Sequence, residues 1–339
     1  MTAPRLEPLP HGGDIDAARA RYPDAPEPWV DLSTGINPHA YPVPEVTSGA
    51  WRQLPQSVAE HDLLLAARRR YGVTADVNIV AAPGSQALIQ IVPRLIDASE
   101  VAIVGPTYGE HAASWQRCGH RVREVASIAE IGAARVVIVV NPDNPTGRIF
   151  SADELSDLAD NLAARDGLLV VDEAFADFAP GDASLASRLP ASVVILRSFG
   201  KAYGLAGARM GFAIAHERWC SPLRAEVGPW AVAGPALEIG TAALSDDVWL
   251  AAMAKTLDAD CRRLDQLLQD AGLAVVGGTQ LFRLAECARA PALADALACA
   301  GILVRSFPYN CNWLRFGLPG DDAQWRRLET TLRNFQSSV

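Results

Sequence analysis

The sequence predicts an α/β protein in which a large domain with a mainly parallel sheet is followed by a smaller α+β C-terminal domain. Five short apolar runs rich in β-branched residues alternate with amphipathic stretches, at residues 101–104, 136–140, 168–171, 193–196 and 210–214. These runs lack the polar–apolar alternation of half-exposed strands, which is typical of strands covered by helices on both faces. Beyond Pro222 the pattern changes to long helical stretches interleaved with short strands.

The remaining elements can be placed along the chain in order. Residues 1–45 are rich in proline around one short helical stretch at 14–22, so we expect an N-terminal arm that packs on the small domain. The large domain is expected at 46–225 and begins with a helix at 57–71, whose apolar residues share one face. The small domain is expected at 226–339, with helices at 234–245 and 246–271 and from Pro291 and Asp321, and strands near 273–276, 281–284, 303–305 and 314–316.

Composition narrows the class of protein. The 339 residues carry a net charge of −9 and are half apolar, which argues against nucleic acid as a partner and allows a sizeable core. The six cysteines lack CxxC or other metal-type spacing, so we expect reduced thiols and no metal site. We see no signal-peptide pattern and no apolar stretch of about 20 residues, so we expect a cytoplasmic protein without a membrane partner.

One lysine lies in a constellation that matches the needs of pyridoxal 5'-phosphate (PLP). Lys201 follows Ser198 by three residues and precedes Arg209 by eight, while a carboxylate, an amide and a glycine-led segment lie upstream at Asp172, Asn144 and Gly84-Ser85-Gln86. A PLP site requires an amine that binds the cofactor aldehyde covalently, groups that neutralise its phosphate, and a carboxylate that keeps the pyridine nitrogen protonated. We assign these tasks to Lys201, to Ser198 with Arg209, and to Asp172.

The same residues are expected at one edge of the predicted sheet. Asp172, Ser198 with Lys201, and Asn144 each follow a different predicted strand, and ligands of open α/β sheets collect at the carboxyl ends of strands. Gly84-Ser85-Gln86 opens an apolar helical pattern, where backbone N–H groups can bind a phosphate. An ordinary helix cap for Gly84-Ser85 and a purely structural carboxylate for Asp172 are the alternatives.

Other interpretations of the lysine segment fail on spacing. A P-loop needs a glycine where Ile195 stands and a Ser or Thr where Ala202 stands. A dinucleotide fingerprint needs a strand that leads into GxGxxG, and this segment has none. A solvent-exposed structural lysine is the remaining alternative.

The chain resembles fold-type I PLP enzymes of the aminotransferase class I/II superfamily, in the branch of the histidinol-phosphate aminotransferases. The segments that carry the finer resemblance, to the L-threonine-O-3-phosphate decarboxylases of cobalamin biosynthesis, are His11-Gly-Gly-Asp-Ile15, Asp31-Leu-Ser-Thr-Gly-Ile-Asn-Pro38 and Asp172-Glu-Ala-Phe-Ala-Asp-Phe178. The resemblance implies that Tyr108 stacks on the cofactor ring, for which core filling is the alternative. It further implies that Arg315 forks the α-carboxylate of the substrate, and that the phosphate or polar end is held by His11, Asn37 and Arg305.

Two positions depart from the pattern of the superfamily. Phe175 stands where many relatives have a tyrosine that bonds the cofactor's phenolic oxygen, and phenylalanine cannot form that bond. Leu54 stands where relatives have a tyrosine that reaches the neighbouring subunit's cofactor phosphate. This contact is therefore absent or supplied by another residue.

The resemblance implies two candidate reactions and a homodimer. The first is decarboxylation of L-threonine O-3-phosphate, a small phosphorylated amino acid, to (R)-1-amino-2-propanol O-2-phosphate. The alternative is a histidinol-phosphate-type aminotransferase, which would use the same cofactor residues. A PLP-sensing regulator without catalytic activity is disfavoured, because the N-terminal arm is too short and not basic enough for a DNA-binding module.

Overall fold

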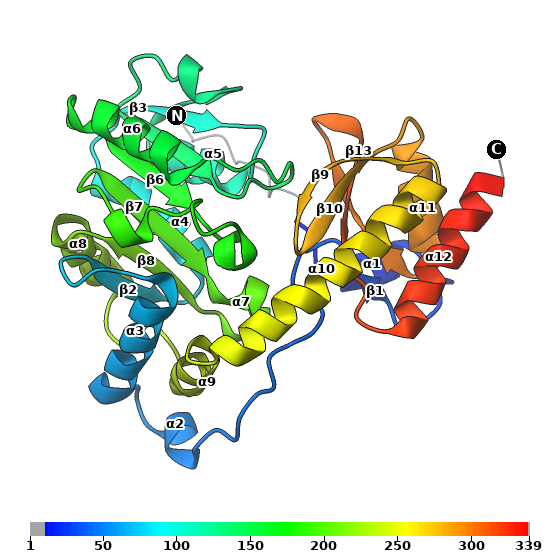
Figure 1. The fold of residues 1–339 in the computed structure, drawn as a ribbon, viewed down its shortest axis with the longest axis horizontal. Coiled ribbons are helices and arrows are strands. Elements are labelled where there is room, and N and C mark those ends of the chain that lie inside the picture. Colours follow the sequence, from blue (N-terminus) through cyan, green and yellow to red (C-terminus); the bar gives the residue numbers. More distant parts are fainter. Residues whose placement is uncertain (1–10, 338–339) are drawn as a thin grey trace.

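The computed structural model describes residues 11–337, which form two units joined by a long helix (Figure 1). The large unit is built on a seven-stranded sheet, in the spatial order β2 (Asn78–Ala82), β8 (Gly211–Ala215), β7 (Val193–Ser198), β6 (Leu168–Asp172), β5 (Val136–Val140), β3 (Glu100–Val104) and β4 (Arg121–Val125). All neighbouring strands are parallel except the pairs that involve β8. The predicted α/β fold with a mainly parallel sheet is confirmed. The edge strands β2 and β4 have no counterpart among the predicted strands.

Helices cover both faces of this sheet, as the apolar runs predict. Alternate residues of β5 enter two separate cores, with Val137 and Val139 in one and Val136 and Ile138 in the other. The first core is closed by α3 (Ser57–Tyr71), α6 (Ala152–Ala163) and α9 (Gly234–Leu244), and the second by α4 (Ser85–Ile91), α5 (Glu110–Arg117) and α8 (Glu217–Val227). Shorter elements of the large unit are α2 (Ser48–Arg52), α7 (Phe199–Ala202), η1 (Val92–Leu95), η2 (Ile128–Glu130), η3 (Ala176–Phe178), η4 (Ala186–Arg188) and η5 (Ala206–Ala208).

The small unit has its own antiparallel sheet and its own core. Its strands lie in the order β12 (Arg305–Phe307), β13 (Asn310–Gly317), β10 (Phe282–Glu286) and β9 (Ala274–Thr279), and its helices are α10 (Asp247–Asp270), α11 (Ala290–Cys299) and α12 (Asp322–Ser337). Leu250 of α10 still belongs to the large core, whereas Leu257 belongs to the small one. The two cores therefore change over within α10. The predicted domain limits at residues 45 and 225 stay predictions.

The N-terminal segment runs from the small unit down to the large one (Figure 1). Its helix α1 (Ile15–Arg21) is followed by β1 (Val30–Asp31), which pairs in parallel with β11 (Ile302–Leu303) of the small unit. The chain then binds the large unit, where the backbone N–H of Asn37 donates to the carbonyl of Lys201 at 3.0 Å. This segment therefore bridges both units.

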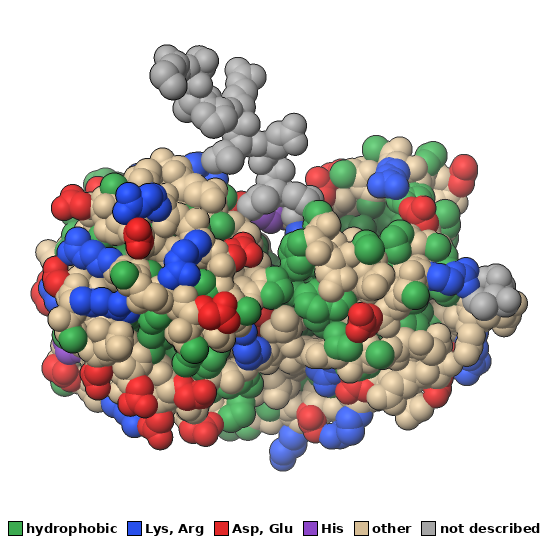
Figure 2. All heavy atoms as spheres, turned by 90° about the horizontal axis from the view of Figure 1, so that it is seen from above, with side chains coloured by type: hydrophobic (Ala, Val, Ile, Leu, Met, Phe, Trp, Pro, Cys, Tyr) green, Lys and Arg blue, Asp and Glu red, His purple; other side chains and the backbone are tan. Residues whose placement is uncertain are grey.

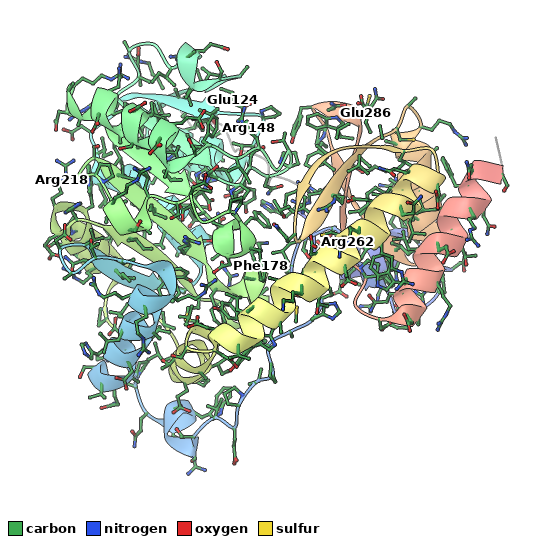
Figure 3. All side chains as sticks on the ribbon, viewed as in Figure 1. Glu124, Arg148, Phe178, Arg218, Arg262 and Glu286 are labelled. Atoms are coloured by element: carbon green, nitrogen blue, oxygen red, sulfur yellow. The ribbon has the colours of Figure 1, made fainter. Side chains whose placement is uncertain are left out.

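The two units also meet at the loop after β6. Phe178, labelled in Figure 3, packs against the cores of both units. The surface is hollowed between the two lobes (Figure 2). Among residues 11–337, no helix is both long and apolar enough to cross a lipid bilayer.

Candidate active site

The carboxyl edge of the large sheet gathers the polar residues that the motifs single out. Asp172 and Ser198 are the last residues of β6 and β7, which are parallel neighbours, and Asn144 follows β5 by four residues. The backbone N–H of Asn141 donates to the carbonyl of Asp172 at 2.8 Å, which ties the loop after β5 to the end of β6. Parallel pairing therefore brings these three segments to one place.

Lys201 lies in the short helix α7 directly after β7, in a setting that favours its neutral form. Burial and the positive charge of Arg315 lower the pKa of Lys201 to about 8, while the carboxylates of Asp172 and Asp31 act in the opposite direction. The Nζ atom lies 5.6 Å from the centroid of the Phe175 ring. Lys201 is therefore within electrostatic reach of Asp172 and Arg315 and has a greater neutral fraction at neutral pH than an ordinary lysine.

Asp172 is buried, with 3% of its surface exposed, and both of its carboxylate oxygens have partners. Oδ2 lies 2.9 Å from Nε2 of His111, and Oδ1 accepts from the backbone N–H of Ala174 at 3.0 Å. His111 is in α5 and is equally buried. His111 belongs to no recognisable motif, and its only local signal in the sequence is its position three residues after Tyr108.

Ser198, Arg209 and the glycine-led start of α4 lie side by side. Ser198 is paired with Gly211 in the β7–β8 ladder, and Gly211 approaches Ser85 so closely that an added Cβ would collide with the Ser85 N–H. Gly84 has a left-handed φ of 89°, and a Cβ there would lie 2.8 Å from Nη2 of Arg209. No side chain of a described residue caps α4. A hydroxyl, a guanidinium and a helix N-terminus thus form a donor set suited to a phosphate.

Tyr108 and Gln86 form a hydrogen-bonded pair beside this site. The Tyr108 hydroxyl donates to Oε1 of Gln86 at 3.1 Å, and Nε2 of Gln86 donates to Oε2 of Glu110 at 2.9 Å. Burial and the negative charges of Glu110 and Asp172 raise the pKa of Tyr108 to about 12. The hydroxyl therefore keeps its proton at neutral pH.

Arg315 reaches the site from β13 of the small unit. Its Nη1 donates to Oδ1 of Asn144 and its Nη2 donates to the backbone carbonyl of Ser33, while its Nε has no hydrogen-bond partner among the described residues. Burial and the charge of Arg305 lower the pKa of Arg315 to about 10. Arg315 thus stays cationic at neutral pH, with a buried donor still available.

His11 and Arg305 line one cavity. The cavity holds about 500 Å³ between the N-terminal segment, α11 and the β12–β13 hairpin. Burial lowers the pKa of Arg305. The Nε2 atom of His11 lies 3.3 Å from Oε1 of Glu110, so the arm contacts α5 of the large unit.

Asn37 is buried and its side chain is engaged by the protein. Its Nδ2 donates to the carbonyl of Ala202 at 2.8 Å, and its Oδ1 accepts from the backbone N–H of His39 at 2.9 Å. These bonds attach the N-terminal segment to the helix that carries Lys201. A direct contact of Asn37 with a substrate stays a prediction.

Glu173 follows Asp172 directly and has different partners. It is fully buried and forms an ion pair with Arg197 at 2.7 Å. Phe175, two residues on, packs edge-on against Phe282 of the small unit with ring centroids 5.1 Å apart. The segment after β6 is therefore anchored in both units.

The residues present fit a PLP molecule. They supply a buried amine of lowered pKa, an oriented carboxylate, a phosphate-type donor set and an aromatic ring, all at one edge of one sheet. Among the described residues, no group of three or more His, Cys, Asp or Glu could hold a metal ion.

Comparisons with known proteins agree with this chemistry. Residues 28–332 match the family described as aminotransferase class I and II. Two relatives are threonine-phosphate decarboxylases, from a Sinorhizobium species (44% identity, covering 97% of this chain and 99% of the relative) and from Pseudomonas aeruginosa (40%, 97% and 98%). A solved histidinol-phosphate aminotransferase from Sinorhizobium meliloti, in complex with pyridoxal-5'-phosphate, has a TM-score of 0.80 at 22% identity and covers 99% of each chain.

Proposed function

Because the chain belongs to the aminotransferase class I and II family of PLP enzymes, we propose that it decarboxylates L-threonine O-3-phosphate. The products are (R)-1-amino-2-propanol O-2-phosphate and carbon dioxide, a step of cobalamin biosynthesis. The observation that carries this proposal is the name threonine-phosphate decarboxylase on both full-length relatives described above. The alternative is a histidinol-phosphate-type aminotransferase. The solved aminotransferase structure described above is similar to this chain in fold, and it does not favour one reaction over the other.

We assign the cofactor to residues at the carboxyl edge of the large sheet. Lys201 would bind its aldehyde, and Asp172 would hold the proton on its pyridine nitrogen. The other cofactor-binding residues in this assignment are Gly84, Ser85, Gln86, Tyr108, Asn144, Ser198 and Arg209. When bound, PLP supplies an electron sink for the pair left behind as a bond at Cα breaks.

Lys201 has the acid–base properties that this role needs. Because its pKa is lowered to about 8, Lys201 is neutral and nucleophilic in a fraction of the molecules near neutral pH. As a free amine beside Cα, Lys201 could also hold and deliver a proton there. Asp172 is fixed by contacts with His111 and Ala174, so its carboxylate would need little reorganisation to meet the pyridine nitrogen.

The choice of reaction depends on how the two ends of the substrate are held. Arg315 would bind the α-carboxylate through its planar guanidinium, and Arg305 and His11 would bind the phosphate. A substrate held at both ends presents one Cα bond to the electron sink. With the carboxylate bond in that position, carbon dioxide leaves and Cα then takes up a proton. Asn37, which attaches the arm to α7, would hold His11 at a fixed position relative to Lys201.

We also propose a homodimer whose interface includes an apolar patch of the large unit, which we call the tryptophan patch. It comprises Trp51, Leu54 and Val58 around α2 and the start of α3, with Trp230 just before α9, and α9 packs on both helices. Trp51 is 71% exposed and Leu54 is 59% exposed, which is costly for a single chain in water. Trp230 has a left-handed φ of 55°, a strained backbone that is common at functional surfaces. A second copy of this chain is the occupant we propose.

A cytoplasmic location is part of the same proposal. All six cysteines are free thiols in the structure, including the exposed Cys299 and Cys311. Free exposed thiols persist in reducing compartments.

The test of the function is direct. Holoenzyme given L-threonine O-3-phosphate should release carbon dioxide without a 2-oxo acid, whereas an aminotransferase would need one. Amino transfer to 2-oxoglutarate without carbon dioxide release would refute the proposal.

A further inference from the structure

Glu110 connects the N-terminal arm to the cofactor side of the site. It is the first residue of α5, and only 8% of its surface is exposed. Its two carboxylate oxygens contact residues from different parts of the chain. Neither the motifs nor the resemblance singles it out.

The first oxygen determines how Gln86 is oriented. Oε2 of Glu110 accepts from Nε2 of Gln86 at 2.9 Å and lies 3.5 Å from Nη2 of Arg117. An ionised carboxylate can only accept hydrogen bonds, so the Gln86 amide must present its nitrogen to Glu110. Its carbonyl oxygen then faces the Tyr108 hydroxyl, which donates to it at 3.1 Å. Glu110 thereby fixes the ring that we place against the cofactor.

The second oxygen holds the arm. Oε1 lies 3.3 Å from Nε2 of His11, whose ring centroid is 6.1 Å from that of Tyr108. The backbone beside His11 is fixed as well, since the N–H of Gly13 donates to Oγ of Ser33 at 2.7 Å. The other ring nitrogen, Nδ1, forms no hydrogen bond to any described residue, and the ring lines the cavity that also contains Arg305.

We propose that Glu110 is a positioning residue that orients His11 for the substrate phosphate through one oxygen and Gln86 with Tyr108 for the cofactor through the other. The part concerning phosphate rests on the proposed function. With both ring nitrogens protonated, the His11 ring donates from Nε2 to Glu110 and from Nδ1 to a phosphate oxygen in the cavity. The alternative is that Glu110 only forms a solvated ion pair with Arg117. Its replacement would then change neither phosphate binding nor PLP binding.

The experiment is a rapid-mixing spectral titration of purified holoenzyme with O-phospho-L-threonine, which is the proposed substrate, and with L-threonine, and the binding spectrum is recorded before turnover begins. Glu110→Gln keeps one acceptor for Gln86 but removes the charge that orients His11. We expect it to weaken binding of the phosphorylated ligand about tenfold and of L-threonine less than about twofold. In a His11→Ala background the same substitution should cause no further loss, because the two residues act through one contact.

Glu110→Ala tests the cofactor end. It removes both acceptors, so the apparent dissociation constant of PLP should rise about tenfold over the wild type, whereas Glu110→Gln should stay within about threefold. Glu217→Gln is the matched control, since it removes an exposed carboxylate of α8 that pairs with Arg224. Circular dichroism and thermal melting of each variant separate misfolding from loss of binding.

The outcomes distinguish the two proposals. Suppose first that the wild type binds the phosphorylated ligand more tightly than L-threonine. The positioning role towards His11 is then overturned if Glu110→Gln weakens the binding of both ligands equally. It is also overturned if Glu110→Gln has its full effect in the His11→Ala background. If Glu110→Ala binds PLP as well as Glu110→Gln does, the role towards Gln86 is overturned. If the wild type shows no preference for the phosphorylated ligand, the proposed substrate is wrong, and the phosphate part of this inference is overturned with it.

Discussion

Nε2 of His111 lies 2.9 Å from Oδ2 of Asp172, and both side chains are almost completely excluded from solvent. Because the other Asp172 oxygen accepts from Ala174, the carboxylate is fixed from two directions. A carboxylate held in this way can meet a pyridine nitrogen without rearrangement, and its charge acts in a region of low dielectric. The pair therefore ties helix α5 to the end of β6 at the centre of the site.

Replacing Asp172 by asparagine should leave PLP bound but slow turnover severely. A neutral amide does not hold the proton on the pyridine nitrogen, so we expect kcat to fall more than about 100-fold, about 3 kcal/mol in the barrier. His111→Phe keeps the carboxylate and removes one of its partners, so its loss should be smaller. Steady-state rates and the visible band of bound cofactor measure both effects. An asparagine variant within threefold of the wild type would show that Asp172 is only structural.

The fold could be predicted largely from hydrophobic patterning, and the two edge strands of the large sheet, which were not predicted, show its limit. All five predicted runs of the large sheet are strands, because strands buried on both faces are continuously apolar. The edge strand β4 has the sequence RVREV and is mostly exposed, so it lacks that signal. The other edge strand, β2, is a short run that pairs only with the reversed strand β8.

Site residues that directly follow a strand could be predicted from the sequence. Site residues that act through contacts with distant parts of the chain could not. Asp172, Ser198 and Asn144 are located by the parallel sheet itself. His111 and Glu110 gain their meaning only from contacts with Asp172 and His11, which are about 60 and 100 residues away in sequence. Nothing in a local pattern marks such pairs.

The lowered pKa of Lys201 should appear in the pH dependence of cofactor capture. Only the neutral amine reacts with the PLP aldehyde, and burial lowers the pKa of Lys201 from the usual 10.5 to about 8. The rate at which apoenzyme binds added PLP should therefore rise about tenfold per pH unit below 8 and level off above it. Stopped-flow absorbance would record this profile, with Lys201→Ala as the control that shows no visible band. An inflection near 10 would contradict the assigned environment.

Arg315 should affect both binding and turnover. Its guanidinium would hold the substrate carboxylate, and it already bridges Asn144 and Ser33 across the two units. Arg315→Lys keeps the charge but loses the planar fork, so we expect KM to rise and kcat to fall by about tenfold each. Kinetics with O-phospho-L-threonine measure both constants. A change in kcat alone, with KM preserved, would argue against carboxylate binding.

The proposed dimer can be tested at the tryptophan patch. Sedimentation should give twice the chain mass of 36.1 kDa for the wild type and a shift towards that mass for Trp51→Asp, since a buried aromatic at an interface stabilises association. Val276→Asp, at another exposed apolar position in the small unit, is the control and should stay dimeric. A fully active wild-type monomer at micromolar concentration would refute the dimer.

The most direct test of the central claim is the fate of the substrate carboxylate. Purified holoenzyme is given L-threonine O-3-phosphate labelled in its carboxylate carbon, with and without 2-oxoglutarate, and Lys201→Ala serves as the inactive control. We predict labelled carbon dioxide in amounts equal to the aminopropanol phosphate formed, at the same rate with or without the 2-oxo acid. Retention of the label, with the amino group recovered as glutamate, would contradict a decarboxylase.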